Sequence, residues 1–288
     1  MTKARRLGLH AVTVLLTIYS CFAFASYSHL PSYYPQELIN QLNENTARNH
    51  QLKKILHNVT AQAHIKKSSG RDVIARYCPS NETCEIQITT RSYREAREIL
   101  FGEIHLEKVR GEYIVRDLYC EQVIDESQGV GPGRIPNPKF MNCEHTWPQS
   151  RFNPNEDTNA QLTDLHHLFP VNSRANSSRG NNIFAEVDGD VVNSECTSSY
   201  RGRAIGSSEI AFEPPAEHKG DVARALFYFS IRYNHPIGPL EEEFLKNWHQ
   251  EDPVDEFERE RHEKVYQHQK NRNPFIDAPQ LVELVSDF

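Results

Sequence analysis

The first hydrophobic feature of the chain is residues 7–24, which are apolar apart from His10 and a few small polar residues. Basic side chains precede this run at Lys3, Arg5 and Arg6. The run ends in Ala23-Phe24-Ala25, which has the small residues of a cleavage site. The pattern predicts a signal peptide over residues 1–25 that is cut after Ala25.

A membrane anchor and a lipid anchor are the alternatives to a cleaved signal. The apolar run is barely long enough to span a bilayer, and no basic stop-transfer flank follows it. Cys21 could carry a lipid, but Tyr19 and Ser20 before it make a poor lipidation site. We therefore expect an exported chain, secreted or periplasmic, without a membrane anchor.

Beyond residue 25 the apolar positions recur at helical and at alternating spacings. They predict helices over residues 35–63, 92–101, 221–233, 240–249 and 254–269, a further helix within 164–182, and strands over 74–77, 85–89, 113–123 and 184–192. Ser92, with Glu95 three residues later, is the expected N-cap of one helix, and Asp221 is the N-cap candidate of another.

A Gly/Pro-rich stretch over residues 129–138 cannot form a helix or a central strand. The segment after it is expected to open on a short strand. We find no internal repeat and no linker in the sequence. The pattern therefore predicts a single domain of mixed α and β structure, with helices dominant late in the chain.

The formal net charge of the 288-residue chain is −7, and loss of the basic leader would make it more negative. This charge counts against a protein that holds nucleic acid by bulk electrostatics, because such proteins are usually basic. It does not exclude a local basic groove or a bound cation. Many of the acidic residues lie in one stretch, residues 241–263.

Five of the six cysteines would remain after cleavage, and export makes disulfides plausible. Cys78 and Cys84 flank a turn-like segment and are the expected pair. A second pair could form among Cys120, Cys143 and Cys196, which leaves one thiol over, and the sequence does not choose among the three options. The chain has no CxxC spacing, which disfavours a structural zinc site.

A carboxylate and an imidazole stand side by side at Glu144 and His145. A carboxylate can hold a hard cation and a histidine can take a proton from water, which together suit metal-assisted hydrolysis of a phosphodiester. The plainer alternative is a surface glutamate beside a hydrogen-bonded histidine. Trp147 and Pro148 after the pair favour a rigid, packed turn over a loose surface.

A second polar cluster follows at residues 164–182. His166 and His167 could join His145 in a zinc site, or Asp164 could cap a turn with His166 as a packing residue. The cluster is rich in amides and also holds two arginines: Asn172, Asn176, Asn181, Asn182, Arg174 and Arg179. Asparagine suits turns and caps as well as hard cations, and arginine suits phosphates as well as solvated helix surfaces.

Three segments resemble the bacterial endonuclease I family of secreted or periplasmic nucleases: residues 142–150 (NCEHTWPQS), 164–170 (DLHHLFP) and 176–181 (NSSRGN). The similarity continues through residues 212–215, 219–228, 248–255 and 271–277. It covers roughly residues 90–285, and the motifs follow one another in the order of the family. Residues 26–75 contribute nothing to it, so the resemblance implies an α+β nuclease domain over residues 76–288 that follows an N-terminal helical extension over residues 26–75.

The resemblance implies a ββα-metal core, also called a His-Me finger, surrounded by helices. It implies that His145 is the general base and that Glu144 is a metal ligand. Asn181 would be the second protein ligand, with the adjacent Asn182 in its place if the register differs by one. The expected cofactor is one Mg²⁺ ion, with Mn²⁺ or Ca²⁺ as alternative occupants.

The family also uses an arginine to hold the phosphate, and Arg179 and Arg224 are the guesses for it in this chain. The implied reaction is sequence-nonspecific endonucleolytic hydrolysis of DNA, and possibly of RNA, to 5′-phosphate products. The substrate would be bound through its backbone, and the enzyme is expected to be a monomer.

Two other functions compete with a metal-dependent nuclease. The first is an exported nucleic-acid-binding protein that has kept the scaffold but lost catalysis. The intact set of Glu144, His145 and Asn181 argues against it. The second is a zinc hydrolase built on His145, His166 and His167, which predicts stoichiometric zinc in the purified protein.

Overall fold

The computed structural model describes residues 26–288, so the signal peptide expected over residues 1–25 lies outside the described part. Within that part, none of the helices has the length and apolar character needed to cross a membrane. Helices and short strands alternate along the chain, which gives the mixed α+β character expected from the sequence.

The helices are α1 Gln36–Asn43, α2 Asn49–Ala61, α3 Tyr93–Ile99, α4 Thr158–Thr163, α5 Ser173–Arg179, α6 Ala216–Arg232, α7 Pro239–Glu251, α8 Glu256–Gln269 and α9 Pro274–Asp277. The strands are β1 Ala63–Ile65, β2 Val73–Ala75, β3 Cys84–Glu85, β4 Glu107–Val109, β5 Glu112–Arg116, β6 Val123–Asp125, β7 Met141–His145, β8 Leu168–Asn172, β9 Ile183–Phe184, β10 Val187–Asn193, β11 Cys196–Ala204 and β12 Ile210–Glu213. They form four small sheets, ordered β2-β1-β3, β4-β5-β6, β7-β8 and β10-β11-β12-β9.

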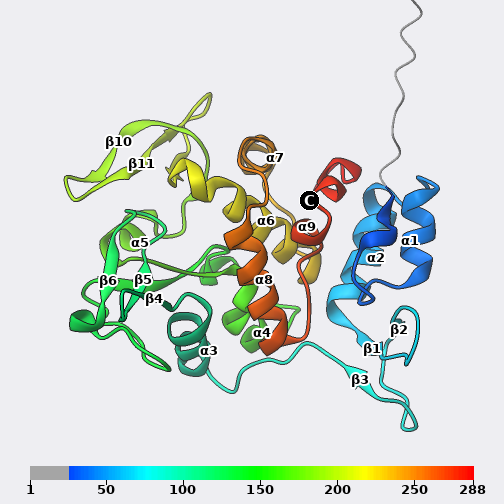
Figure 1. Ribbon diagram of the computed structural model, residues 1–288. Helices are drawn as coiled ribbons and strands as arrows, with labels where there is room; N and C mark the ends of the chain where they lie inside the picture. The colour runs from blue at the N-terminus through cyan, green and yellow to red at the C-terminus, as the bar shows by residue number, and fades with distance from the viewer. Residues whose placement is uncertain (1–25) are drawn as a thin grey trace, which may run out of the picture.

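Helix α6 is the centre of the fold. Residues 220–231 of this helix are all buried, which is the behaviour of a helix packed on every side. The N-terminal helices α1 and α2 lie at one end of the molecule beside α9, and the small sheets β4-β5-β6 and β10-β11 lie at the opposite end (Figure 1).

The hydrophobic core does not divide at residue 75. Leu52 and Leu56 of α2 belong to the same buried cluster as Phe227 of α6. The C-terminal segment closes this cluster, because the ring of Phe288 stacks on Phe227 at a centroid distance of 4.2 Å. Tyr34 adds a polar contact, donating its hydroxyl to Asp277 at 2.6 Å.

Two capping predictions have different outcomes. The Ser92 hydroxyl accepts the backbone N–H of Glu95 at 3.2 Å and caps α3, as expected. Asp221 is not an N-cap, because α6 begins five residues earlier, after Pro215. Its carboxylate instead contacts the His218 ring at 3.0 Å inside the helix. Proline at the entrance was the better signal for this helix start.

Two of the expected elements are interrupted by turns. The helix expected over residues 35–63 is split into α1 and α2, where Asn45 adopts a positive φ of 57°. The strand expected over residues 113–123 is wrong beyond Arg116. The Asp117 carboxylate accepts the backbone N–H groups of Tyr119 and Cys120, which turns the chain back into β6.

Two disulfides stabilise the loops of the protein. Cys78 is joined to Cys84, the pair expected from the sequence. The second bond joins Cys120 to Cys196 and settles the choice that the sequence left open. Cys143 is a buried free thiol, and burial raises its pKa to about 12.

Strands β7 and β8 and helix α5 form one compact unit. The two strands pair antiparallel, with Glu144 opposite Phe169 and His145 opposite Leu168. Helix α5 begins directly after β8, and its N-cap Asn172 accepts the N–H groups of Arg174 and Ala175. This unit carries the Glu144-His145 pair on one strand and Arg179 on the helix.

Candidate functional site

A hollow of about 490 Å³ opens at the end of β7. Its wall combines the Glu144-His145 pair with the turn over residues 148–150 and the C-terminal end of α5. Asn181, which follows α5, lies on the same wall. Gly180 between them has a positive φ of 57° and ends the helix, so the chain turns before Asn181.

His145 is held with one ring nitrogen available. Its Nε2 lies 2.9 Å from the backbone carbonyl oxygen of Leu162, which can only accept a hydrogen bond, so Nε2 carries the proton. The Nδ1 lone pair accepts the amide of Gln149 at 3.2 Å on the wall of the hollow. Burial, with the nearby His167 and Arg179, lowers the pKa of His145 to about 3, so the ring is neutral near pH 7.

Glu144 is a buried carboxylate with one oxygen fixed and one open. Its Oε1 accepts the Tyr119 hydroxyl at 2.9 Å and lies 3.0 Å from Nη1 of Arg179. No hydrogen bond to its Oε2 is found within residues 26–288, and the side chain lies on the wall of the hollow. Burial raises the pKa of Glu144, while Arg179 and the Tyr119 hydroxyl oppose that rise.

The two candidate asparagines occupy different places. The Asn181 amide nitrogen lies 3.4 Å from the Ser150 hydroxyl, and its amide oxygen has no partner among the described residues. The Asn182 amide donates to the backbone carbonyl of Arg179 at 2.7 Å and does not line the hollow. The geometry therefore favours Asn181 over Asn182 as the residue that shares a site with Glu144.

Neither guessed phosphate-binding arginine is free in the structure. Arg179 is buried and donates to the carbonyls of His145 and Thr146 at 3.1 and 2.7 Å, besides its contact with Glu144. Arg224 lies on α6, away from the hollow, and pairs with Glu258 at 2.7 Å. Both guanidinium groups are bound to buried partners, because a buried charge needs compensation, although the Nε of Arg179 has no hydrogen-bond partner among the described residues.

The histidines of the second polar cluster support the scaffold. His166 Nε2 lies 3.1 Å from the Asn271 carbonyl, and His167 Nε2 lies 2.7 Å from the Gln161 carbonyl. Asp164 accepts the hydroxyls of Tyr228 and Tyr233 and caps the turn before His166, as the packing interpretation expects. Among residues 26–288, the three histidines of the zinc alternative do not bring their ligand atoms together.

We expect the rings of His166 and His167 to stay neutral in the folded protein at pH 5. Burial lowers their pKa values to about 3 and about 4, whereas an unfolded histidine titrates near ~6.5. Each folded ring therefore resists a proton that the unfolded chain accepts. Its contribution to stability falls by roughly 1.4 kcal/mol per pH unit as the pH drops from ~6.5 toward the folded pKa. Ring resonances followed by NMR from pH 7 to 5 should not shift, and a titration near pH 6.5 would contradict this.

A different cluster, His262, Glu263 and Asp277, has ligand atoms close enough to hold a metal ion. The Arg272 guanidinium lies between its two carboxylates and bonds to both. An arginine therefore already supplies the positive charge at this place.

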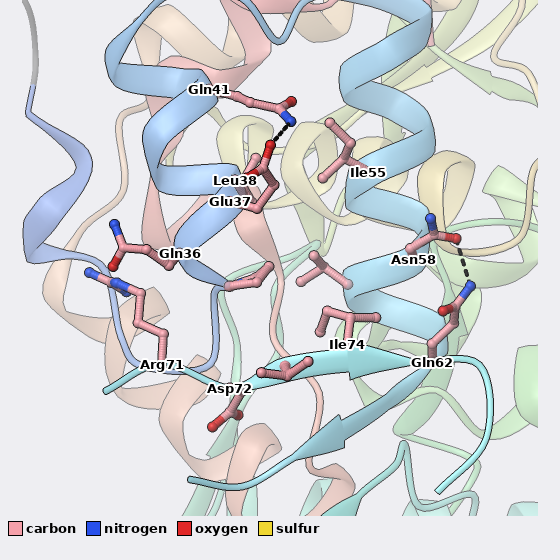
Figure 2. A pocket seen from close by; sticks show the side chains of 13 residues that line it. Gln36, Glu37, Leu38, Gln41, Ile55, Asn58, Gln62, Arg71, Asp72 and Ile74 are labelled. Carbon is pink, nitrogen blue, oxygen red and sulfur yellow. Dashed lines mark hydrogen bonds between the residues drawn. The ribbon is translucent and has the colours of Figure 1, made fainter. Parts of the chain in front are cut away.

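A second hollow, of about 460 Å³, lies between α1, α2 and β2 (Figure 2). Glu37 in its wall accepts the Gln41 amide, and Gln62 donates to Asn58. The nearby Asp72 is paired with Lys66 at 2.9 Å. This hollow has no histidine in its wall, so it lacks the combination of base and open carboxylate found at β7.

Sequence reasoning missed three residues of the candidate site: Tyr119, Gln149 and Tyr93. Tyr119 reaches Glu144 from the turn between β5 and β6, and no local pattern reports such a contact. Gln149 lies within the segment around Glu144 and His145, and its spacing of four residues from His145 was the available signal. Tyr93 on α3 approaches the His145 ring at 5.2 Å between centroids.

A carboxylate, a neutral imidazole and an amide thus meet at one hollow on a two-stranded sheet and a helix, which defines an α+β protein with a polar site suited to a hard cation. The chain belongs to the endonuclease I family, because the family model described as Endonuclease I matches residues 37–280. This match begins within the N-terminal helices, whereas the motif resemblance began near residue 90.

Several curated proteins are similar to part of the chain. An extracellular ribonuclease of Bacillus amyloliquefaciens is 37% identical over 160 residues, which cover 49% of this chain and 52% of that protein. An extracellular deoxyribonuclease of Aeromonas hydrophila is 28% identical over 126 residues, covering 42% and 52%. An Endonuclease-1 of Buchnera aphidicola is 27% identical over 115 residues, covering 40% and 44%. The chain spans about half the length of the curated relatives it matches.

Proposed function

We propose that this protein is an exported, Mg²⁺-dependent, sequence-nonspecific endonuclease. It hydrolyses phosphodiester bonds of DNA, with RNA as a second substrate, to 5′-phosphate products. One observation carries the proposal: the hollow at β7 brings together a neutral histidine whose unprotonated Nδ1 contacts only the Gln149 amide, a carboxylate whose Oε2 accepts no hydrogen bond within residues 26–288, and the amide of Asn181.

The unit of β7, β8 and α5 would be the ββα-metal core of this enzyme. An antiparallel strand pair followed at once by a helix is the arrangement that the name describes. The site lies within residues 76–288, which we propose as the nuclease domain. Residues 26–75 would be its helical extension, and residues 1–25 would be the signal peptide that directs the protein to the periplasm or the medium.

The residues of the hollow fit a single Mg²⁺ ion. Magnesium prefers a few protein oxygens and keeps several waters. Glu144 Oε2 and the Asn181 amide oxygen are two oxygens of this kind, and neither accepts a hydrogen bond within the described chain. When bound, the ion would supply positive charge that offsets the negative charge developing on the phosphate and on the leaving 3′ oxygen.

His145 would act as the general base. Its Nε2–H is held by the Leu162 carbonyl, which fixes the tautomer and leaves Nδ1 to take a proton from water. Gln149, which now donates to Nδ1, would give way to that water. The resulting hydroxide attacks phosphorus in line with the 3′ oxygen, which gives a 5′ phosphate. Tyr119 and Arg179 would orient Glu144 by holding its other oxygen.

The names of the relatives support a nucleic-acid substrate but do not distinguish DNA from RNA. Some relatives are named ribonucleases and others deoxyribonucleases. Substrate binding through the phosphate backbone would suit both and would need no reading of bases. We propose that the protein acts as a monomer.

Chelation should stop the enzyme. In millimolar EDTA, cleavage of supercoiled plasmid should fall to background. Without a metal ion, Glu144 and Asn181 cannot offset the negative charge of the transition state. Addition of excess Mg²⁺ should restore nicked and linear products with 5′ phosphates. Cleavage that continues in EDTA, or that returns with Zn²⁺ and not with Mg²⁺, would refute the metal assignment. Tight plasmid binding without turnover in Mg²⁺ would instead indicate a binding protein.

A further inference from the structure

The arginines of the α3 segment differ in their partners. Arg91 and Arg94 pair with Glu95 and Glu98 at 3.5 and 2.9 Å. Arg97 has no carboxylate within ion-pair distance among residues 26–288. Its Nε is buried without a hydrogen-bond partner. Unpartnered buried polar groups are rare in proteins, and a guanidinium in this state is ready for an anion.

Arg97 contacts a residue of the hollow's wall, Tyr93, although it does not line the hollow itself. Its guanidinium carbon lies 4.9 Å from the centroid of the Tyr93 ring, in a cation–π contact. The Tyr93 ring in turn lies 5.2 Å from the His145 ring and forms part of the wall.

The hollow needs such a cation. A nucleic-acid strand brings one negative charge with every phosphate, and the whole chain has a net charge of −7. Arg179 cannot meet this need because it is buried against Glu144, and Arg151 beside the hollow is paired with Glu241 at 2.9 Å. Arg97 is thus an unpaired guanidinium, within the described chain, held one ring away from His145.

We propose that Arg97 binds a phosphate of the substrate strand next to the scissile one, while the Tyr93 ring holds the guanidinium in place. This inference rests on the proposed nuclease function. It assigns Arg97 to substrate binding, apart from the proton transfer at His145 and from the two metal ligands. The planar fork of arginine matches phosphate oxygens, which a lysine at the same position would do less well.

The test measures binding without cleavage. A fluorescent single-stranded oligonucleotide is titrated, in Mg²⁺, into the His145→Ala protein with and without Arg97→Gln. We expect Arg97→Gln to weaken binding about tenfold and to reduce the slope of log affinity against log salt by about one phosphate contact. Arg97→Lys should recover part of the loss. Arg94→Gln on the same helix is the matched control, since Arg94 is paired and exposed.

Equal affinity and equal salt slope for the Arg97→Gln and Arg94→Gln proteins would overturn the proposal. If Arg97→Gln fails to fold, as judged by thermal unfolding, the comparison of Arg97→Lys with Arg94→Lys decides, because a phosphate role predicts weaker binding in Arg97→Lys alone. The proposed function has a separate readout: a wild-type protein that leaves plasmid intact in Mg²⁺ refutes the nuclease. Normal wild-type cleavage with an unaffected Arg97→Gln variant refutes this inference alone.

Discussion

Replacing His145 with alanine should reduce the rate of plasmid cleavage by about 10²–10⁴-fold, the usual contribution of a general base. The effect should appear in kcat, because in the proposed mechanism Nδ1 of His145 acts on the attacking water and not on the bound strand. Initial rates on supercoiled plasmid in excess Mg²⁺ measure it. Full activity in the variant would end the assignment of His145 as base.

Two controls separate lost chemistry from lost folding. His145→Gln keeps an amide that can donate toward the Leu162 carbonyl from the place of Nε2, so it should unfold close to the wild-type temperature and still lack activity. His50→Ala changes an exposed histidine on α2, away from the hollow, and should cleave as the wild type does. A variant that is inactive because it is unfolded would lose its cooperative thermal transition.

Replacing Arg179 with methionine should destabilise the protein by about 3–5 kcal/mol, because it leaves the buried Glu144 carboxylate without its cation. The carbonyls of His145 and Thr146 would lose their donors at the same time. Urea unfolding measures the free energy, and Mg²⁺ binding by calorimetry should weaken as Glu144 loses its orientation.

A double-mutant cycle tests the cause of that loss. Glu144→Gln removes the charge that Arg179 compensates, so the variant with both changes should be more stable than the sum of the two single effects predicts. Strict additivity would show that Arg179 acts through the backbone carbonyls and not through Glu144. A loss below about 1 kcal/mol in Arg179→Met would contradict a buried ion pair altogether.

The sequence predicted those features of the fold that depend on local order. The Ser92 cap, the helices α7 and α8 and the irregular loop over residues 129–138 all follow from nearby residues and were found. The break at Asn45 and the turn at Asp117 were missed, since each depends on one residue leaving an otherwise regular pattern.

The residues of the candidate site that are neighbours in the sequence were predictable, and those that come together only in the fold were not. Glu144 and His145 are neighbours in sequence, so their pairing was visible at once. The roles of the arginines were not visible, because a guanidinium is assigned by its partners, and Arg179 bonds to His145 and Thr146, which lie more than 30 residues away. Arg97 went unnoticed, because it differs from Arg91 and Arg94 only in lacking a carboxylate partner. That difference is visible only in the three-dimensional structure.

The packing of Phe288 against Phe227 constrains the order of folding. The backbone N–H of Ile237 donates to the Phe288 carbonyl, and the backbone N–H of Ser286 donates to the Asn49 side chain, so the last residues tie α2 to the segment after α6. Contacts between distant parts of a chain form late and slow the search for the native state. We therefore expect the central helix to be fully sheltered only after residue 288 has been synthesised, so that assembly of the protein finishes late and not while its N-terminal part is still being made.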